Sequence, residues 1–190
     1  MKSKKTIIIC ALVTILILGG VISGVSLLFN HPLRIEKPTF IYIDRDDTAD
    51  SVYVKLQRDL NATHLTGFKM LARLKKYDQQ IHSGAYRFDA SINTLTLFRR
   101  LSSGHQTPVK VVIPSVRTLS RLARSLDRQL MPDSTEFARL VGDSAFCASL
   151  GFSLETMPAL FIPNTYEAYW NTDAEAFILS LIHISEPTRR

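Results

Sequence analysis

The sequence has few cysteines and no recognisable metal-binding spacing. Only Cys10 and Cys147 occur among its 190 residues. Cys10 lies inside a long apolar run, so the two thiols are not expected to meet in a disulfide. Cys147 is expected to fill a helix face as a small apolar residue. Neither cysteine supports a metal site, and the sequence gives no reason to expect a cofactor.

A pattern typical of nucleic-acid binding is also missing. The formal net charge is +6, but Lys2, Lys4 and Lys5 at the N-terminus supply part of it. The basic stretch KMLARLKKYDQQ fits the solvated face of a helix and has no interleaved aromatic patch. We therefore expect no nucleic-acid partner, although nonspecific attraction to anionic lipid headgroups stays open.

Charged side chains are absent from the segment Thr6–Phe29. About 20 apolar residues span a bilayer as a helix, because the backbone must satisfy its own hydrogen bonds in hydrocarbon. A cleaved signal peptide would have an apolar core of about 7–15 residues and a small-residue cleavage site, and NHPLRIEK offers none. The preceding lysines place residues 1–5 in the cytoplasm. The sequence thus predicts a single transmembrane helix over residues 6–29, with the bulk of the chain on the far side.

A polar linker, residues 30–38, leads to a strand–helix–helix–strand pattern. Alternation predicts a strand at Thr39–Asp44, and Ser83–Phe88 returns to extended structure after Gly84. Apolar residues at helical spacing predict two helices between them. Asp47 or Thr48 is the expected cap of the first helix. This order resembles a LysM-like module, a small unit often associated with peptidoglycan. A structural spacer is the equally open alternative.

A further helix, capped by Ser91, is expected to end at Gly104, which closes the LysM-like region at residues 39–104. The segment that follows, residues 105–178, mixes strands and short helices. A strand is predicted at Val109–Pro114, and helices are predicted from about Asp133, Asp143 and Thr172. The strongest helix lies between them, with a single apolar stripe formed by Leu119, Leu122, Ala123, Leu126 and Leu130. The fold class predicted is therefore mixed α/β (α+β).

Four segments stand out together: YRF with the helix after it, SSGHQTPVKVVIPSVRTLSRLARSL, DSAFCASLG and LFIPNTYEAYW. They resemble the endolytic murein transglycosylase family (MltG, also called YceG-like), in the versions found in Bacteroides-type bacteria. The resemblance extends from the apolar segment to about Ile178. It implies a single-pass inner-membrane protein facing the periplasm that cleaves nascent glycan strands and leaves 1,6-anhydro-N-acetylmuramic acid ends. The implied partners are peptidoglycan glycan strands, the lipid bilayer and peptidoglycan synthases.

The sequence departs from the family pattern at several positions. Ser115 and Val116 follow Pro114 where the family has Pro-Glu-Gly. The family's Glu-Gly-Tyr-Leu-Phe-Pro-Asp-Thr-Tyr segment is retained only in part: Pro163, Thr165 and Tyr166 match, whereas Pro158, Ala159 and Asn164 replace Glu, Gly and Asp. Its aromatic and polar residues still suggest the lining of a carbohydrate groove. The candidate substrate-binding residues are Asn164, Thr165, Tyr166, Tyr169 and Trp170.

The residue that would perform the chemistry is missing from the sequence. A lytic transglycosylase needs one glutamic acid, kept protonated near neutral pH by an apolar pocket. In the family this residue belongs to a Glu-x-Glu-Thr helix after the aromatic segment, and no such motif occurs here. Glu155 lies in a polar turn, Glu175 fits a capping box, and Glu167 does not align with the catalytic position. No residue of this chain is therefore assigned a catalytic role.

The C-terminal letters LSLIHISEPTRR do not look like the family and resemble translated sequencing-adapter sequence. Residues 179–190 are therefore expected to be a non-native tail without packed contacts from about Leu179 onward, and residues 105–178 to be a partial catalytic domain. Such a chain should be inactive. The alternative is a non-enzymatic bitopic envelope protein that uses its strand–helix–helix–strand unit for peptidoglycan binding or scaffolding.

The membrane topology can be tested with a fusion after Lys37. A reporter enzyme that works only in the cytoplasm should be silent there, because the uncharged run Thr6–Phe29 and its lysine flank predict a cytoplasmic N-terminus. Strong reporter activity from that fusion would overturn the orientation.

Overall fold

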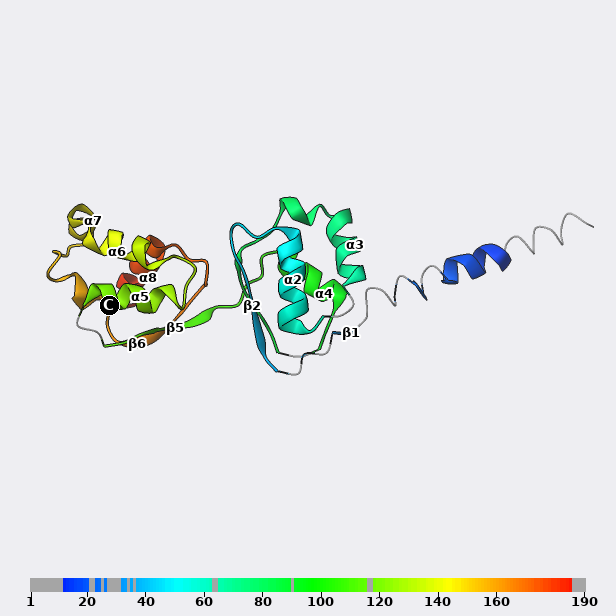
Figure 1. Cartoon of the computed structure of the whole chain (residues 1–190), viewed down its shortest axis with the longest axis horizontal. Coiled ribbons are helices and arrows are strands. Elements are labelled where there is room, and N and C mark those ends of the chain that lie inside the picture. The colour runs from blue at the N-terminus through cyan, green and yellow to red at the C-terminus, as the bar shows by residue number, and fades with distance from the viewer. Residues whose placement is uncertain are drawn as a thin grey trace, which may run out of the picture. The chain divides into compact units, whose positions relative to one another are not determined.

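The structure is a computed structural model that describes residues 12–20, 23–24, 26, 32–33, 35, 37–62, 65–89, 91–115 and 118–185. Strands and helices alternate along the chain (Figure 1), which agrees with the mixed α/β class. The strands are β1 (Pro32–Leu33), β2 (Thr39–Ile43), β3 (Gly84–Phe88), β4 (Ile92–Asn93), β5 (Val109–Ile113) and β6 (Asn164–Ala168). The α-helices are α2 (Ala49–Leu60), α3 (Thr66–Leu74), α4 (Thr94–Ser102), α5 (Leu119–Asp127), α6 (Ser134–Gly142), α7 (Ser144–Ser149) and α8 (Ala174–Ser185). The 3-10 helices are η1 (Tyr77–Gln79) and η2 (Met157–Leu160).

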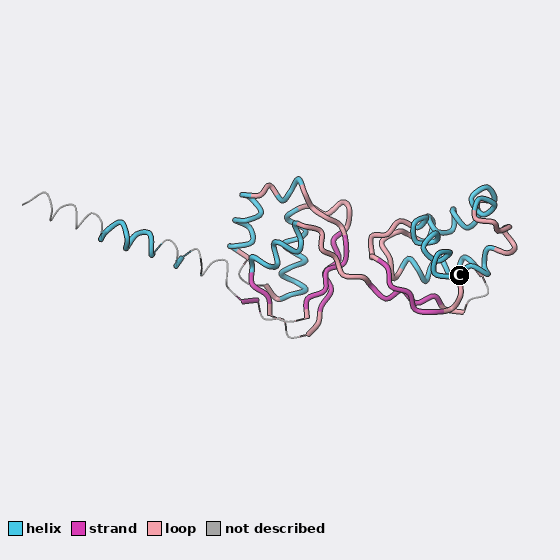
Figure 2. Tube along the Cα trace, turned by 180° about the vertical axis from the view of Figure 1, so that it is seen from behind, coloured by secondary structure: helices cyan, strands magenta, loops and turns pink. Residues whose placement is uncertain are grey.

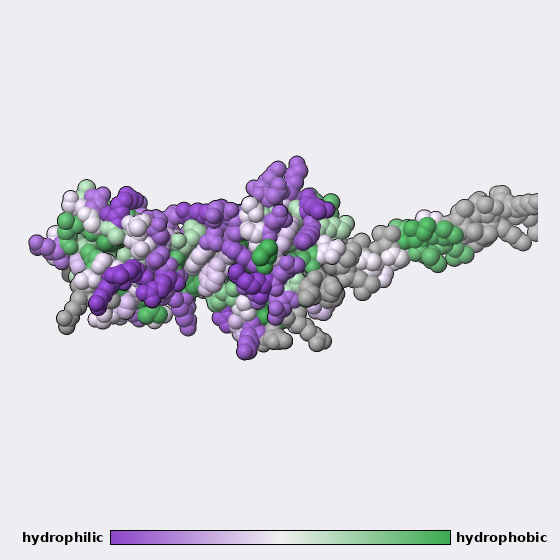
Figure 3. All heavy atoms as spheres, viewed as in Figure 1, coloured by the Kyte–Doolittle hydropathy of each residue, from purple (hydrophilic) through white to green (hydrophobic). Residues whose placement is uncertain are grey.

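The predicted transmembrane segment is described only in part. Residues 12–20 are helical, and Figure 3 shows them as an apolar stretch. Within the described ranges, no helix has both the length and the apolar character needed to cross a bilayer. Much of Thr6–Phe29, including residues 6–11 and 27–29, lies outside those ranges.

The described chain divides into two compact units. Unit 1 comprises residues 1–41, 47–82 and 87–105, and unit 2 comprises residues 42–46, 83–86 and 106–190. Three two-stranded sheets are present among the described strands, pairing β1 with β4, β2 with β3, and β5 with β6. The division passes through β2 and β3, so each of these strands contributes residues to both units.

Unit 1 is organised around one phenylalanine. Phe68 on α3 is fully buried and meets Tyr53, Tyr77 and Phe98 edge-on, with ring centroids 5.6 to 6.0 Å apart. Edge-to-face contacts of this kind suit the quadrupoles of aromatic rings and add to the apolar area that they bury. The order β2, α2, α3, β3 matches the expected strand–helix–helix–strand pattern, and its LysM-like character stays a proposal.

The helix caps confirm one expectation and correct another. Thr48 caps α2, and its side chain and Ser51 form a reciprocal capping box of the kind that satisfies two backbone donors at a helix start. The prediction of Ser91 as the cap of the following helix is wrong. Asn93 caps α4, accepting a hydrogen bond from Thr96 N–H at 2.7 Å, because the preceding residues pair with β1 instead of entering the helix.

Unit 2 is built on the antiparallel β5–β6 ribbon. The register runs from Val109 opposite Ala168 to Ile113 opposite Asn164, and the helices of this unit lie on one side of the ribbon (Figures 1 and 2). Val109, Val111 and Ile113 are buried, whereas the alternate residues Lys110 and Val112 are exposed. This is the period of two expected of a strand with one covered face.

The outer edge of β5 is closed by a side chain. The Gln129 amide accepts a hydrogen bond from Val112 N–H at 2.7 Å and donates one to Val112 C=O at 3.0 Å. Its Nε2 also donates to the Ser125 carbonyl. Unpaired strand edges invite pairing with other chains, so Gln129 both protects this edge and ties the end of α5 to the ribbon.

The expectation about the C-terminal segment is wrong for the residues that the structure describes. Helix α8 continues to Ser185, and Leu181 is only 2% exposed. Phe177, Ile178 and Leu181 recur at helical spacing and pack inward, so the apolar face of the helix does not end at residue 178. Residues 186–190 lie outside the described residues, and the origin of residues 179–190 stays a hypothesis.

The close approach of Gln106 to Gly84 provides a test of the packing within unit 2. The Gly84 φ of +151° and the 2.6 Å between a built Cβ and the Gln106 Oε1 atom leave no room for a side chain. Gly84→Ala should lower the free energy of unfolding by about 2 kcal/mol, because strain and crowding outweigh the reduced freedom of the unfolded chain. Urea unfolding of the full chain, followed by circular dichroism, measures the effect.

Gly142→Ala is the matched control. Gly142 ends α6, and a Cβ there meets nothing within 4 Å, so alanine should leave stability unchanged or raise it by about 0.5 kcal/mol. Equal unfolding midpoints for the two variants would show that Gly84 is not crowded as described.

Candidate functional site

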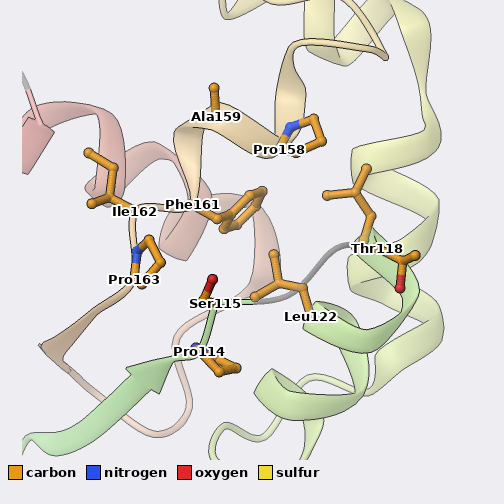
Figure 4. Close-up of a pocket in the computed structure, with 10 residues that line it drawn as sticks. Pro114, Ser115, Thr118, Leu122, Pro158, Ala159, Phe161, Ile162 and Pro163 are labelled. Carbon is orange, nitrogen blue, oxygen red and sulfur yellow. The ribbon is translucent and has the colours of Figure 1, made fainter.

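A pocket of about 310 Å³ in unit 2 joins two segments that lie far apart in the sequence. We call it the proline pocket because Pro114, Pro158 and Pro163 contribute to its wall. Figure 4 shows the segment 158–163 on one side and residues 114–122 on the other. The remaining lining residues are Ser115, Thr118, Leu119, Leu122, Ala159, Phe161 and Ile162.

The β5–β6 register brings the two walls together. Ile113 is the last residue of β5 and faces Asn164, the first residue of β6, so Pro114 and Pro163 flank the same end of the ribbon. Proline lacks a backbone donor and ends regular strand pairing at both positions. Helix α5 then begins at Leu119 and supplies the floor of the pocket.

The wall formed by residues 158–163 is held by local contacts. Pro158 lies in the first turn of η2, where its missing N–H costs no hydrogen bond. The buried Tyr166 side chain donates a hydrogen bond from its hydroxyl to the Ile162 carbonyl at 3.0 Å. Tyr166 therefore fixes the turn between η2 and β6 from inside the unit.

The chemistry available in the proline pocket is limited. Phe161, Ile162 and the leucines make it mainly apolar, and Ser115 and Thr118 bring hydroxyl groups. None of its described lining residues carries an ionisable side chain. Such a surface can accept the apolar face of a ligand and exclude water, but it has no group that transfers a proton at neutral pH. Val116, part of the departure from the family pattern, lies outside the described residues.

The glutamates considered from the sequence lie elsewhere. Glu155, Glu167 and Glu175 are all exposed, and none of them lines the proline pocket. Glu167 is on β6 directly opposite Lys110 of β5, where opposite charges support strand pairing. This position favours the surface role over a catalytic one. Within the described ranges, no group of three or more His, Cys, Asp or Glu residues could hold a metal ion.

The five candidate substrate-binding residues are not gathered in one pocket. Asn164 and Thr165 are exposed at the start of β6, and Tyr169 is 49% exposed after its end. Tyr166 is 9% exposed and hydrogen-bonded inside the unit, so its ring is not available for stacking on a sugar and its role here is structural. Trp170 lines a different hollow from the proline pocket.

That hollow, the Tyr42–Trp170 groove, has a volume of about 440 Å³ and lies within unit 2. The two rings contact each other with centroids 5.1 Å apart and planes tilted by 59°. Burial raises the pKa of the Tyr42 hydroxyl, which keeps it protonated and able to donate a hydrogen bond at neutral pH. The other lining residues are Val109, Lys110, Asp127, Arg128, Gln129 and Leu130.

Sequence reasoning missed most of this groove. Tyr42 belongs to β2, a strand predicted from alternation, and an outward-facing aromatic residue in such a strand was a usable signal. Lys110 and Arg128 carried no comparable signal, because charges on a strand and at a helix end are ordinarily solvated. Their proximity to Trp170 depends on long-range folding.

Comparisons with known proteins give a matching family profile and a similar solved structure. The profile of the YceG-like family matches residues 41–188. A solved structure of a YceG-like protein from Listeria monocytogenes aligns with a TM-score of 0.40 and 16% sequence identity. The alignment covers 78% of this chain and 54% of that one, so the chain spans about half the length of this neighbour. None of the curated proteins matches the chain.

Proposed function

This chain belongs to the YceG-like family, and on that premise we propose that the full-length protein is a membrane-anchored endolytic peptidoglycan transglycosylase. It cleaves nascent glycan strands to give 1,6-anhydro-N-acetylmuramic acid ends and takes part in cell wall assembly. The proposed location is the inner membrane, with a cytoplasmic N-terminus, a span at residues 6–29 and a periplasmic bulk. The proposed partners are glycan strands, the lipid bilayer and peptidoglycan synthases.

The observation that carries the proposal is the composition of the proline pocket. Its two walls come from two segments that resemble the family, VKVVIPS and LFIPNTYEAYW, although Ser115, Pro158 and Ala159 depart from the family pattern. These segments are separated in the sequence by three helices, yet they meet at one end of the β5–β6 ribbon. A pocket assembled from both family segments is the natural place for the family's substrate.

The reaction explains why an apolar pocket is useful. A lytic transglycosylase breaks the bond between the sugar C1 atom and the glycosidic oxygen, which receives a proton from a carboxylic acid. The C6 hydroxyl of the same sugar forms the new bond to C1, and its proton returns to that carboxylate. The acid must be neutral at the start, and an apolar surrounding raises a carboxyl pKa to achieve this.

In this proposal the described residues supply the binding wall but not the acid. The proline pocket excludes water from one side of the sugar, while the general acid comes from outside these 190 residues. The exposed Asn164 and Thr165 side chains offer hydrogen bonds to sugar hydroxyls, and Tyr169 and Trp170 offer ring surface. Tyr166 is proposed to act indirectly, through the turn that it holds.

The domain arrangement is part of the same proposal. Residues 39–104 form a LysM-like region that binds peptidoglycan or acts as a spacer, and residues 105–178 form part of the catalytic domain. Sedimentation of the whole chain with insoluble peptidoglycan tells these two roles of residues 39–104 apart, when substitution of the exposed Lys69 and Arg73 of α3 is compared with Trp170→Ala. Loss of binding only with Trp170→Ala would leave the spacer role.

The activity prediction concerns this chain as it stands. The 190-residue protein should release no anhydro-muropeptides from uncrosslinked glycan strands, because general acid–base help alone typically contributes about 10²–10⁴-fold and the pocket has no acid. Liquid chromatography with mass spectrometry detects the anhydro ends, and a full-length family member provides the positive control.

The variant Glu167→Gln tests whether Glu167 could act as the acid in this chain. It should not alter the null result, since Glu167 is exposed on the outer face of β6. Release of anhydro-muropeptides by the 190-residue chain, together with its loss on Glu167→Gln, would show that the acid lies within this chain and that the proposal places it wrongly.

A further inference from the structure

We propose that the Tyr42–Trp170 groove is a second saccharide subsite, and that it takes a sugar whose substituent carries a carboxylate. The inference rests on the proposed function and deepens it, since it assigns a binding role to a place in unit 2 away from the proline pocket. Its basis is the combination of an exposed aromatic pair, a fixed backbone and exposed cationic side chains in one hollow.

The aromatic pair offers an adaptable surface for a sugar ring. Tyr42 is 41% exposed and Trp170 is half-buried, and their planes are tilted by 59° instead of stacked. A tilted pair presents two faces to the groove, and the C–H face of a pyranose is apolar enough to pack against them. Tyrosine and tryptophan also supply large contact areas at a low cost in side-chain entropy.

The backbone that carries Trp170 is held on both sides. The Trp170 carbonyl accepts a hydrogen bond from Met131 N–H at 2.8 Å. The neighbouring Asn171 side chain donates to the carbonyl and hydroxyl oxygens of Ser83, at 2.9 and 3.2 Å. A ring positioned before the ligand arrives loses little freedom on binding, which favours affinity.

The charged residues of the groove determine which substituent the bound sugar should carry. Lys110 and Arg128 are both exposed, and in the part of the chain that the structure describes neither forms an ion pair. Asp127 is also among the lining residues, and Glu167 lies opposite Lys110 across the ribbon, so Arg128 is the cation that is assigned to the carboxylate. A guanidinium binds a carboxylate in a bidentate manner, whereas Gln129 is already engaged with Val112. The groove therefore favours an acidic over a neutral saccharide.

The position of the groove relative to the proline pocket is set by β5 and α5. Val109 and Lys110, at the start of β5, line the groove, and Pro114, just after its end, lines the pocket. A strand rises about 3.3 Å per residue, so the two sites are separated by roughly 16 Å along β5. Only an extended oligosaccharide can reach both sites, and a disaccharide is too short.

The experiment uses the fact that Trp170 is the single tryptophan of the chain. The full 190-residue protein in detergent is titrated with peptide-free glycan strands, with peptide-bearing strands and with neutral chitooligosaccharides of similar length. Tryptophan fluorescence reports on the groove, and calorimetry reports total binding. Peptide-free strands test the lactyl carboxylate as the acidic group, whereas peptide-bearing strands test the carboxylates of the stem peptide.

Three variants give the expected pattern. Tyr42→Ala should weaken binding of acidic strands about tenfold, which is the loss typical of a truncated aromatic anchor. Arg128→Gln should remove the preference for acidic strands over chitooligosaccharides. Leu154→Ala is the control, because Leu154 is 46% exposed in unit 2 and lines neither the groove nor the proline pocket, and the affinity of this variant should equal that of the unchanged chain. Far-UV circular dichroism verifies that each variant is folded.

The outcomes that would contradict the subsite differ from those that would contradict the proposed function. Calorimetric binding without a change in Trp170 fluorescence, or equal affinities for Tyr42→Ala and Leu154→Ala, would overturn the subsite while leaving the proposed function intact. Chitooligosaccharides that bind as tightly as acidic strands would overturn the carboxylate assignment. No calorimetric binding of any strand would contradict the proposed function, and the subsite would fail with it.

Discussion

The backbone pairing of β5 with β6 is the interaction on which the rest of unit 2 depends. Five residue pairs, from Val109–Ala168 to Ile113–Asn164, join segments that α5, α6 and α7 separate in the sequence. At one end the pairing places Pro114 beside Pro163, and at the other it brings Lys110 to the side of Trp170. A shift of one residue would turn Tyr166 outward and expose the core, so burial itself selects this register.

The β5–β6 ribbon determines which residues of the candidate site have a structural role and which line a hollow. Residues that point inward hold the structure, as Tyr166 does through its bond to Ile162. Residues just beyond one end of the ribbon line the apolar proline pocket, and residues at its other end, together with Tyr42 of β2, line the aromatic groove with its charged neighbours. An apolar wall without an acid can bind and desolvate a sugar but cannot protonate a glycosidic oxygen. The described lining of the proline pocket therefore suits binding and not proton transfer.

Much of the fold could be predicted from local patterns. Alternation predicted β2, the extended segment after Gly84 predicted β3, the apolar run stopped by Pro114 predicted β5, and the leucine stripe predicted α5. The strand β6 was not predicted, since its aromatic residues suggested a groove lining. The outward, inward and outward order of Thr165, Tyr166 and Glu167 was the available signal.

The remaining features depend on contacts between distant residues. Asn93 displaced Ser91 as a cap because the residues before it pair with β1. The contact of Tyr42 with Trp170 has no local signature at all. The packing of Leu181 shows that the apolar helical face continues beyond residue 178, and the family profile matches to residue 188. Sequence patterns predict which face of an element is buried, but not which partner covers it.

The β5–β6 register can be measured directly by cross-linking. Val112 and Thr165 face each other in the ribbon. The backbone N–H and C=O of Val112 bond to the Gln129 side chain and not to β6. Val112 and Thr165 therefore form a pair without mutual hydrogen bonds, whose Cα atoms are about 4.5 Å apart. A disulfide fits that distance. The double variant Val112→Cys/Thr165→Cys, made with Cys10→Ser and Cys147→Ala, should therefore cross-link under mild oxidation, as peptide mapping by mass spectrometry would show. Val112→Cys/Glu167→Cys, a diagonal pair, should stay largely reduced. Preferential cross-linking of the diagonal pair would contradict the register that brings the two family segments into one site.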